Sequence, residues 1–398
     1  MNDAIAPPPL PTETAVPVAF TGVRGEFRRL VMRGAMLELV TLGFYRFWLA
    51  TDMRRHFWSH TSVEGDAPEY TGTAKELLIG FLVALAILVP IYVVYFLIGL
   101  EAERLQAFAS IPLILFFYLF FQFAMYRARR YRLTRTIWRG VRFWMKGSGW
   151  LYALQAGLWM LLVIITAGLA LPWYQAALER YKLRNSFYGD LQGRFDATGG
   201  ALFKQIWWLW VVTVLAFILV GGLATALPPA AGLFSMLVMV WGVFAYAIYK
   251  ACEWRWWLSG IRFGDVRFES KLTTGALFGL YWKVIGWSML ILAMLIAWLG
   301  AVFGSFFYSI GGSGASEQTI ALTFQSTPFL VAVVAGYLVC ALAFGVVVRL
   351  YLRRDVWARV VGSLVIYNLS AADNVTARGE AANALGEGFA DSLDIGGF

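Results

Sequence analysis

Charged residues are scarce in this chain. Asp, Glu, Lys and Arg together make up 14% of its 398 residues, whereas hydrophobic residues make up 60% and aromatic residues 17%. Soluble domains are nearer to about 25% charged, because their surfaces must face water. The shortage of charge therefore excludes an ordinary soluble domain and indicates a protein of the lipid bilayer.

The sequence also lacks the motifs of common enzyme classes. It contains no GxSxG, no Walker loop, no HExxH and no Cys–His cluster. Cys252 and Cys340, the two cysteines, lie in or beside apolar runs and give neither a disulfide framework nor a zinc spacing. The apolar runs hold almost no ionisable residue, which argues against a proton relay. We therefore expect a protein that is not an enzyme and has no cofactor.

Histidine is nearly absent, and its two copies are the remaining candidates for metal chemistry. His56 and His60 are four positions apart, so on a helix they share a face, and Glu64 or Asp66 could add a carboxylate. No other His or Cys lies near them in sequence. An interfacial aromatic role is the favoured interpretation, and no metal ion is predicted.

Long apolar runs dominate the rest of the chain. Each has roughly the 17 to 25 residues that a helix needs to cross the hydrocarbon core. The runs cover 77–99, 108–126, 150–173, 206–227, 233–249, 277–303 and 329–348. They predict an all-α polytopic membrane protein with about six to eight transmembrane helices and short extended segments in its cytoplasmic loops.

The net charge of +9 is unevenly placed between these runs. Basic residues are concentrated in the segments 127–146, 180–204, 250–271 and 349–359. The connections at 100–107, 228–229 and 304–328 hold a single basic residue, Arg104. The positive-inside rule places the basic segments and both termini in the cytoplasm of a multi-pass protein. Anionic membrane lipids, rather than nucleic acid, are the expected partners of these residues.

The run 150–173 conflicts with this layout, because basic segments lie on both sides of it. One crossing there would carry a basic segment to the outer face. The favoured solution is a helix that enters the membrane, breaks near Gly168 and Pro172, and returns. The similar segment 33–57 is interpreted in the same way. This gives about six full crossings plus two non-crossing elements, with seven or eight crossings as the alternative.

Residues related by an offset of 125 positions indicate an internal duplication. Thr41, Gly43, Trp48, Arg55, His56 and Tyr70 correspond to Thr166, Gly168, Trp173, Arg180, Tyr181 and Phe195. Arg130, Tyr131, Arg142 and Phe143 correspond to Arg255, Trp256, Arg267 and Phe268. The predicted organisation is a disordered leader (1–17), a first membrane unit (18–148), a second membrane unit (149–276), a third helical hairpin (277–370) and an acidic tail (371–398).

The acidic tail has one periodic feature. Leu385, Phe389 and Leu393 follow one another at intervals of four, which would place them on one face of a short helix. Such a helix could dock on the basic loops or bind a protein partner, and a frayed tail is the alternative.

Each basic segment repeats an Arg–aromatic pair followed by a glycine turn and a further aromatic residue. Guanidinium groups and aromatic rings together suit a phosphate-bearing headgroup with an apolar part. The candidate headgroup-binding residues are Arg55, His56, Arg130, Arg180, Tyr181, Arg255 and Trp256. The competing interpretation is that these residues are interfacial anchors of membrane helices.

Four segments resemble the YjgN-like family of bacterial inner-membrane proteins. They read TLGFYRFW (41–48), RRHFWSHT (54–61), EYTGT (69–73) and ALGEGFADSLDIGGF (384–398). The chain departs from the family pattern where a Pro is expected before Trp48, although Pro172 precedes Trp173 in the second copy. The resemblance implies a location in the bacterial inner membrane and supplies no activity.

Three functional hypotheses remain at this stage. The first is a transporter-like or lipid-interacting protein whose Arg–aromatic loops engage anionic headgroups or amphiphiles. The second is a membrane scaffold or assembly protein that binds partner proteins through its loops and tail. The third and least favoured is a membrane-embedded enzyme that uses His56, His60 and nearby acids.

Overall fold

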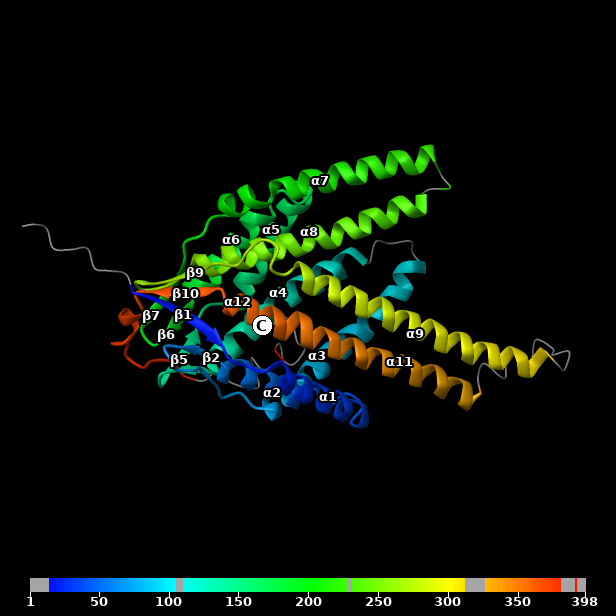
Figure 1. Ribbon diagram of the computed structural model, residues 1–398, viewed down its shortest axis with the longest axis horizontal. Helices are drawn as coiled ribbons and strands as arrows, with labels where there is room; N and C mark the ends of the chain where they lie inside the picture. Colours follow the sequence, from blue (N-terminus) through cyan, green and yellow to red (C-terminus); the bar gives the residue numbers. More distant parts are fainter. Residues whose placement is uncertain are drawn as a thin grey trace, which may run out of the picture.

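The computed structural model describes residues 14–104, 110–227, 229, 231–311, 326–380 and 391. Its helices are α1 (Arg24–Val40), α2 (Arg46–Ser59), α3 (Ala74–Arg104), α4 (Ser110–Thr134), α5 (Gly149–Ile165), α6 (Leu171–Arg184), α7 (Gly199–Ala226), α8 (Ala231–Gly260), α9 (Phe278–Gly311), α11 (Thr327–Val347) and α12 (Val356–Val361), with a π-helical stretch η2 (Val348–Asp355) and a 3₁₀ turn η3 (Leu369–Ala372). The long helices extend from one end of the molecule, where the strands gather (Figure 1).

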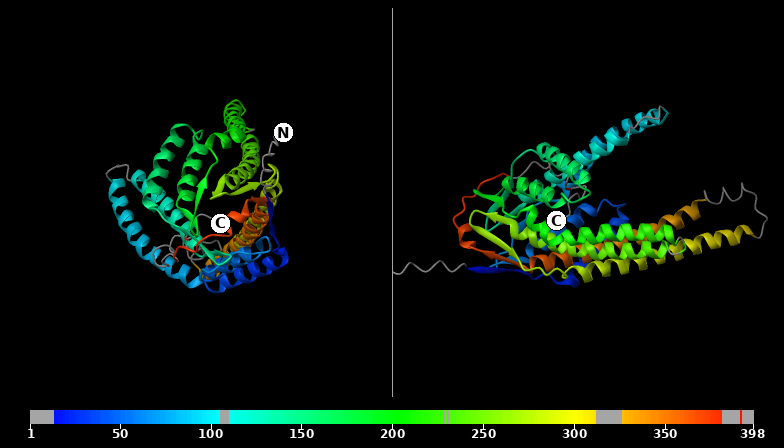
Figure 2. Two further views of the ribbon diagram at one scale, coloured as in Figure 1. Left: turned by 90° about the vertical axis from the view of Figure 1, so that its left-hand side faces the viewer. Right: turned by 90° about the horizontal axis from the view of Figure 1, so that it is seen from above.

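Among the described residues, five helices are long and apolar enough to cross a membrane. They are α3, α7, α8, α9 and the continuous helix from α11 to α12. Five of the predicted runs fall within them, so the chain is a multi-pass membrane protein. The run 108–126 falls mostly in α4, which is not one of the five; residues 105–109 lie outside the described chain. Figure 2 shows the cyan α3 and α4 region set at an angle to the other long helices.

Two shorter helix pairs leave the strand end and come back to it. Helices α1 and α2 connect strands β1 (Ala15–Phe20) and β2 (Thr61–Val63), which pair with each other. Helices α5 and α6 connect β5 (Val141–Met145) and β6 (Ser186–Tyr188), which also pair. Each pair therefore begins and ends on one side, in agreement with the predicted non-crossing elements.

The tips of these two pairs have the same local turn. Thr41 and Thr166 each accept a hydrogen bond at the hydroxyl from the backbone N–H four residues later, at 2.9 and 3.1 Å. Gly43 and Gly168 both have φ of +89°, a left-handed conformation that favours glycine. The break predicted near Gly168 and Pro172 is confirmed. The duplication itself stays a prediction, because a shared turn does not establish a shared unit.

The expectation of an all-α protein is wrong. Within the described residues, ten short strands form one antiparallel sheet in the order β2-β1-β10-β9-β8-β7-β6-β5-β4-β3. The remaining strands are β3 (Glu69–Tyr70), β4 (Thr136–Trp138), β7 (Leu191–Phe195), β8 (Ile261–Phe263), β9 (Val266–Ser270) and β10 (Leu364–Tyr367). The extended segments foreseen in separate loops thus assemble into one element, which residues from all three predicted units build.

Two-residue turns set the register of the hairpins. Trp138 pairs with Val141 across Arg139 and Gly140, which have φ of +46° and +77°, as in a type I′ turn. Gly189 and Gly264 occupy the first turn position of the next two hairpins at φ of +54° and +56°. The glycine turns predicted after the Arg–aromatic pairs therefore close hairpins.

The sheet is curled into a half-barrel. Its two edge strands, β2 and β3, are consecutive in the chain and are separated only by residues 64–68. A connection of that length spans at most about 20 Å, so the two edges of the ten-stranded sheet must lie near each other. Strand β1 begins at Ala15, inside the predicted leader 1–17, and residues 1–13 lie outside the described chain.

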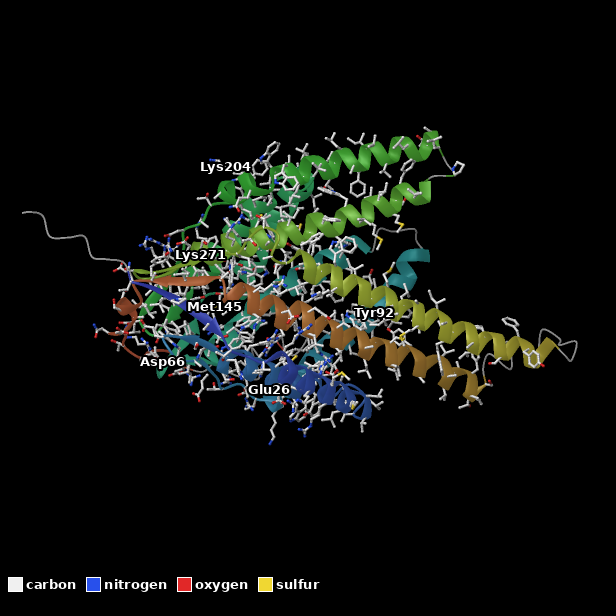
Figure 3. The ribbon with its side chains drawn as sticks, in the orientation of Figure 1. Glu26, Asp66, Tyr92, Met145, Lys204 and Lys271 are labelled. Carbon is white, nitrogen blue, oxygen red and sulfur yellow. The ribbon has the colours of Figure 1, made fainter. Side chains whose placement is uncertain are left out.

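Charged and apolar side chains separate along the molecule. The labelled Asp66, Lys204 and Lys271 lie toward the sheet, whereas Tyr92 lies out along α3 (Figure 3). All four segments that were identified as basic are at the sheet end, since each begins or ends beside a strand. The basic segments therefore lie at one end of the molecule, and their location on one side of a membrane stays a prediction.

The described part of the acidic tail packs on the sheet. Asp373 forms an ion pair with Arg139 at 3.0 Å, and the backbone N–H of Thr376 donates to Asp190. Asp391 is buried against Arg54. Leu385, Phe389 and Leu393, the predicted helical face, lie outside the described residues.

Candidate functional site

The concave face of the sheet and the sheet-end turns of α4, α6, α8 and α12 line a cavity of about 740 Å³. Every described strand except β3 contributes a lining residue. A closed core of this kind would normally be packed without voids larger than a water molecule. A cavity of this volume lies in the range of about 300–1,000 Å³ that is usual for small-molecule sites.

The sheet supplies an aromatic and aliphatic wall. Phe143 of β5 and Tyr188 of β6 are register partners, and their ring centroids lie 4.7 Å apart. Val266 and Phe268 are two positions apart on β9 and face the same side, as the period of a strand requires. These side chains face the cavity because one face of the curled sheet is turned inward.

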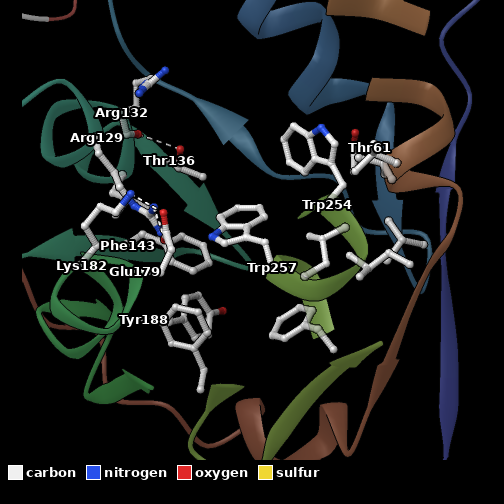
Figure 4. Close-up of a pocket in the computed structure, with 18 of the residues that line it drawn as sticks. Thr61, Arg129, Arg132, Thr136, Phe143, Glu179, Lys182, Tyr188, Trp254 and Trp257 are labelled. Carbon is white, nitrogen blue, oxygen red and sulfur yellow. Dashed lines mark hydrogen bonds and ion pairs between the residues drawn. The ribbon is translucent and has the colours of Figure 1, made fainter. Parts of the chain in front are cut away.

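The helices supply the opposite wall. Trp254 and Trp257 of α8 lie edge to face with centroids 5.5 Å apart, and Leu178 of α6 and Met125 of α4 also line the space. Figure 4 shows Trp257 at the centre of this region, with Trp254 and Thr61 to one side and Phe143 and Tyr188 to the other. Most of the lining is therefore apolar or aromatic.

A cluster of three charged side chains interrupts this apolar lining. Arg129 of α4 forms an ion pair with Glu179 of α6 at 3.1 Å, and Lys182 binds the other carboxylate oxygen. Burial alone would raise the pKa of Glu179, but Lys182 and Arg129 overcome it and lower the pKa to about 2. Glu179 is therefore ionised at neutral pH, and the cluster carries a net positive charge.

A second charged group lies beside the first. Lys250 binds Glu253 one helical turn later, and the side-chain amide of Gln175 donates to Glu253 at 2.7 Å. Within the part of the chain that the structure describes, the carbonyl oxygen of Gln175 is buried and meets no hydrogen-bond donor. The indole N–H of Trp138, on the sheet side, is buried and meets no acceptor among the same residues. Both residues line the cavity, so one acceptor and one donor there are left for a ligand.

The charge balance of the cavity favours an anion. Its ionisable lining residues, apart from tyrosine, are the basic Arg129, Arg132, Lys182 and Lys250 and the acidic Glu179 and Glu253. Four positive and two negative groups leave a balance of +2. Fixed positive charge next to apolar walls attracts an anionic head attached to an apolar body.

Arg132 links the cavity to the C-terminal tail. Asp391 lies between Arg54 and Arg132, with Arg54 Nη2 3.0 Å from one carboxylate oxygen and Arg132 Nε 3.6 Å from the same oxygen. Arg54 also donates to the hydroxyl of Tyr70 at 3.1 Å. Burial would lower the pKa of Arg54, but Asp391 and Tyr70 together raise it. Two acidic residues of the tail, Asp373 and Asp391, thus bind arginines of this chain.

The predicted headgroup-binding residues lie on four helices, and only Trp256 lines the cavity. Arg55 donates to the carbonyl of Gly72, and Arg255 donates to that of Leu272. Both arginines therefore bind the chain just after it leaves a strand, β3 for Arg55 and β9 for Arg255.

The other members of that set have separate surroundings. Tyr181 donates to the carbonyl of Ser148 at 2.9 Å. Arg180 is exposed and Arg130 is half-buried. Their binding of a headgroup stays a prediction.

His56 and His60 stack on each other with centroids 4.2 Å apart. His60 Nδ1 lies 2.8 Å from the carbonyl of His56, while Glu64 and Asp66 bind Arg139 instead of the imidazoles. In the part of the chain that the structure describes, no three His, Cys, Asp or Glu side chains are placed to hold a metal ion. Burial is the main reason that the pKa of His56 is lowered to about 4.

The cavity residues that sequence reasoning missed are direct neighbours of those it selected. Arg129 precedes Arg130, Glu179 precedes Arg180 and Trp257 follows Trp256. One position on a helix turns a side chain by about 100°. Arg129 and Glu179 therefore line the cavity while the selected Arg130 and Arg180 do not, whereas Trp256 and Trp257 both line it. The spacing of Glu179 and Lys182, and of Lys250 and Glu253, was the signal available, because ion pairs form at i, i+3.

The comparisons with known proteins give a family and no activity. Residues 15–392 match the model of a family described as bacterial protein of unknown function, DUF898. No curated protein and no solved structure matches the chain. The match covers nearly the whole sequence, so the chain belongs to the DUF898 family.

Proposed function

We propose that this DUF898 protein binds an amphiphile with an anionic head and an apolar tail in the cavity between the curled sheet and the membrane helices. The observation that carries the proposal is one space of about 740 Å³ that combines aromatic walls with the Arg129–Glu179–Lys182 cluster. The tail of the ligand would lie along the sheet, and its head would lie by the charged helices.

The apolar residues that line the cavity indicate that the ligand has an apolar part. Phe143, Tyr188, Phe263 and Phe268 offer no charge to a polar solute. Burial of apolar ligand surface is worth about 25 cal/mol for each Å² that leaves water. An alkyl chain is therefore stabilised along this wall, whereas a sugar or a free ion is not.

The anionic head follows from the charges. Glu179 already neutralises part of Arg129 and Lys182, and Arg132 shares Asp391 with Arg54. The excess positive charge of the lining is therefore greatest at Arg129 and Lys182, and it remains for the ligand. A carboxylate or phosphate would accept charge-assisted hydrogen bonds from these donors. The free N–H of Trp138 and the free carbonyl of Gln175 add one donor and one acceptor.

The location of the site fits a ligand that partitions into membranes. The cavity lies at the sheet end of five candidate spans. Basic residues gather at this end, and the positive-inside rule favours the cytoplasmic side of the bacterial inner membrane for it. Both ends of the described chain are then cytoplasmic. This orientation and the finer YjgN-like relationship are parts of the proposal. Transport is not required for binding.

The test uses the purified full-length chain and oleate as the probe, with bound oleate measured by native mass spectrometry. Leu191→Trp adds a large ring at a lining position, and Leu237→Trp makes the same change on the exposed face of α8. We expect oleate binding to fall at least about tenfold in the first variant, since a filled pocket loses apolar contact worth more than about 1.4 kcal/mol.

Binding by the Leu237→Trp chain should equal that of the unchanged chain. Equal oleate binding by both tryptophan variants would contradict the proposal, because it would place the fatty acid outside the cavity. Absence of saturable oleate binding to the unchanged chain would contradict it as well.

A further inference from the structure

A second concave site lies on the membrane face, away from the cavity. It is a groove of about 840 Å³ between α1 on one side and α9, α11 and η2 on the other. Helices α9 and α11 belong to the candidate spans, so the surroundings of the groove are the bilayer and not water. Whatever fills it must come from a lipid environment.

The greater part of the groove is apolar and open. Met36 and Met294 are 64% and 59% exposed, and Met32, Leu290 and Val339 are also exposed. Methionine is unbranched and adaptable, so it packs against chains of varied shape. Outward-facing residues of this kind on two membrane helices and one shorter helix form a slot for an acyl chain.

One end of the groove is lined by basic and aromatic residues instead of aliphatic ones. Arg24 and Arg28 lie there on the first turns of α1, next to Tyr351 and Trp287. The Arg24 guanidinium lies 4.9 Å from the centroid of the Tyr351 ring and pairs with Asp355 at 3.1 Å. The indole N–H of Trp287 donates to the hydroxyl of Tyr351 at 3.2 Å. Tyr and Trp at this level are typical of the membrane–water interface.

Arg28 is the basic residue at this end of the groove whose charge is not paired within the described chain. It is exposed, and among the described residues it has no ion pair and no hydrogen bond. An arginine at the headgroup level offers two parallel N–H groups to a phosphate. The other basic residue that lines the groove, Arg24, is held by Asp355, so Arg28 supplies the free positive charge at the mouth.

The spacing along α1 matches a phospholipid. Arg28, Met32 and Met36 follow at intervals of four on one face, and eight residues of helix rise about 12 Å. A headgroup at Arg28 would therefore place its acyl chain along Met32 and Met36, at the depth of the hydrocarbon. We propose that this groove binds one anionic phospholipid of the surrounding membrane, with its phosphate at Arg28.

The test measures lipid retained by the full-length chain. Protein in nanodiscs of phosphatidylglycerol is transferred to detergent, and bound lipid is counted by native mass spectrometry. Arg28→Gln removes the free charge, and Met294→Trp narrows the groove at an exposed position. Arg29→Gln is the matched control, because Arg29 is exposed on the same helix but does not line the groove.

We expect retained phosphatidylglycerol to fall about fivefold in Arg28→Gln, as for one arginine near a membrane surface, and to fall in Met294→Trp. The Arg29→Gln chain should retain the unchanged amount. Equal retention by Arg28→Gln and Arg29→Gln would overturn the proposal. Equal retention from phosphatidylcholine nanodiscs would also overturn it, since no anionic headgroup would be needed.

The groove and the cavity are tested separately. The loss in Arg28→Gln should persist in a chain that also carries Leu191→Trp, in which the cavity is filled. A loss that disappears in this background would assign the retained lipid to the cavity and overturn the groove site.

Discussion

Removal of the Asp391 carboxylate should release the C-terminal tail from the protein. The side chain is 1% exposed, and the side chains of Arg54 and Arg132 on either side of it are each 10% exposed. The change Asp391→Asn keeps the shape of the side chain but leaves two buried guanidinium groups without their counter-charge. Loss of one partner from a buried ion pair is strongly destabilising.

The free-energy cost of Asp391→Asn follows from the burial of the ion pairs that Asp391 makes. Breaking a buried pair costs about 3–5 kcal/mol, because the remaining charge stays desolvated. Each 1.4 kcal/mol is about a factor of ten in an equilibrium constant, so the docked form of the tail should become at least about a hundredfold less favoured. The matched change Asp373→Asn removes an exposed carboxylate that shares Arg139 with Glu64 and Asp66. It should cost at most about 1 kcal/mol.

Limited proteolysis and thermal unfolding of the purified chain measure both effects. The Asp391→Asn chain should lose its tail to protease much faster than the Asp373→Asn chain, and its unfolding midpoint should match that of a chain ending at residue 380. Arg54→Met combined with Asp391→Leu should recover part of the loss, because a buried apolar pair replaces a buried ionic one. Equal protease resistance in Asp391→Asn and Asp373→Asn would refute this reasoning.

Two further predictions concern pH and the helix-pair tips. The folded-state pKa of His56 is about 4, below its ordinary value of 6.5, so the unfolded chain binds more protons than the folded chain between these two pH values. The contribution of His56 to stability should be full above pH 6.5 and should fall as the pH drops toward 4. His56→Phe should therefore flatten the pH dependence of the unfolding midpoint. Unchanged pH dependence would count against the buried neutral imidazole. Gly43→Ala should destabilise the chain by about 1–2 kcal/mol, since an alanine is strained at φ of +89°. Gly200→Ala in α7, where no left-handed conformation is required and a methyl group meets no atom within 4 Å, should not lower the midpoint.

The membrane helices could be predicted from the sequence because each is a long apolar run that is recognisable by itself. A run such as 233–249 needs no partner to show that it can cross a bilayer, and charge asymmetry then groups the connections. The break at Gly168 was readable for a similar reason, since glycine and Pro172 act on the local backbone.

The sheet could not be predicted from the sequence because its strands are two to six residues long and pair with strands that are far apart in the chain. Strand β1 pairs with β10, which lies about 350 positions later. No local pattern records such a pairing, so the segments were interpreted as separate extended loops. The cavity depends on this sheet and was missed with it.

The ion pairs of the cavity illustrate a further limit of prediction from the sequence. The sequence identified Arg–aromatic helix ends, but a choice between Arg129 and Arg130 depends on which face of α4 turns inward. That face is set by packing against α5 and the sheet, not by the local sequence. The same holds for Asp391, whose contacts lie more than 250 residues away in Arg54 and Arg132.

Photo-crosslinking tests the amphiphile cavity most directly. A fatty acid with a photoreactive group in its alkyl chain would be bound to the purified protein and irradiated, and the modified peptides would be identified by mass spectrometry. The cavity predicts adducts on the strand peptides around Phe143, Tyr188 and Phe268, and their loss with excess oleate. Adducts confined to the outward faces of the long helices, or insensitive to excess oleate, would contradict it.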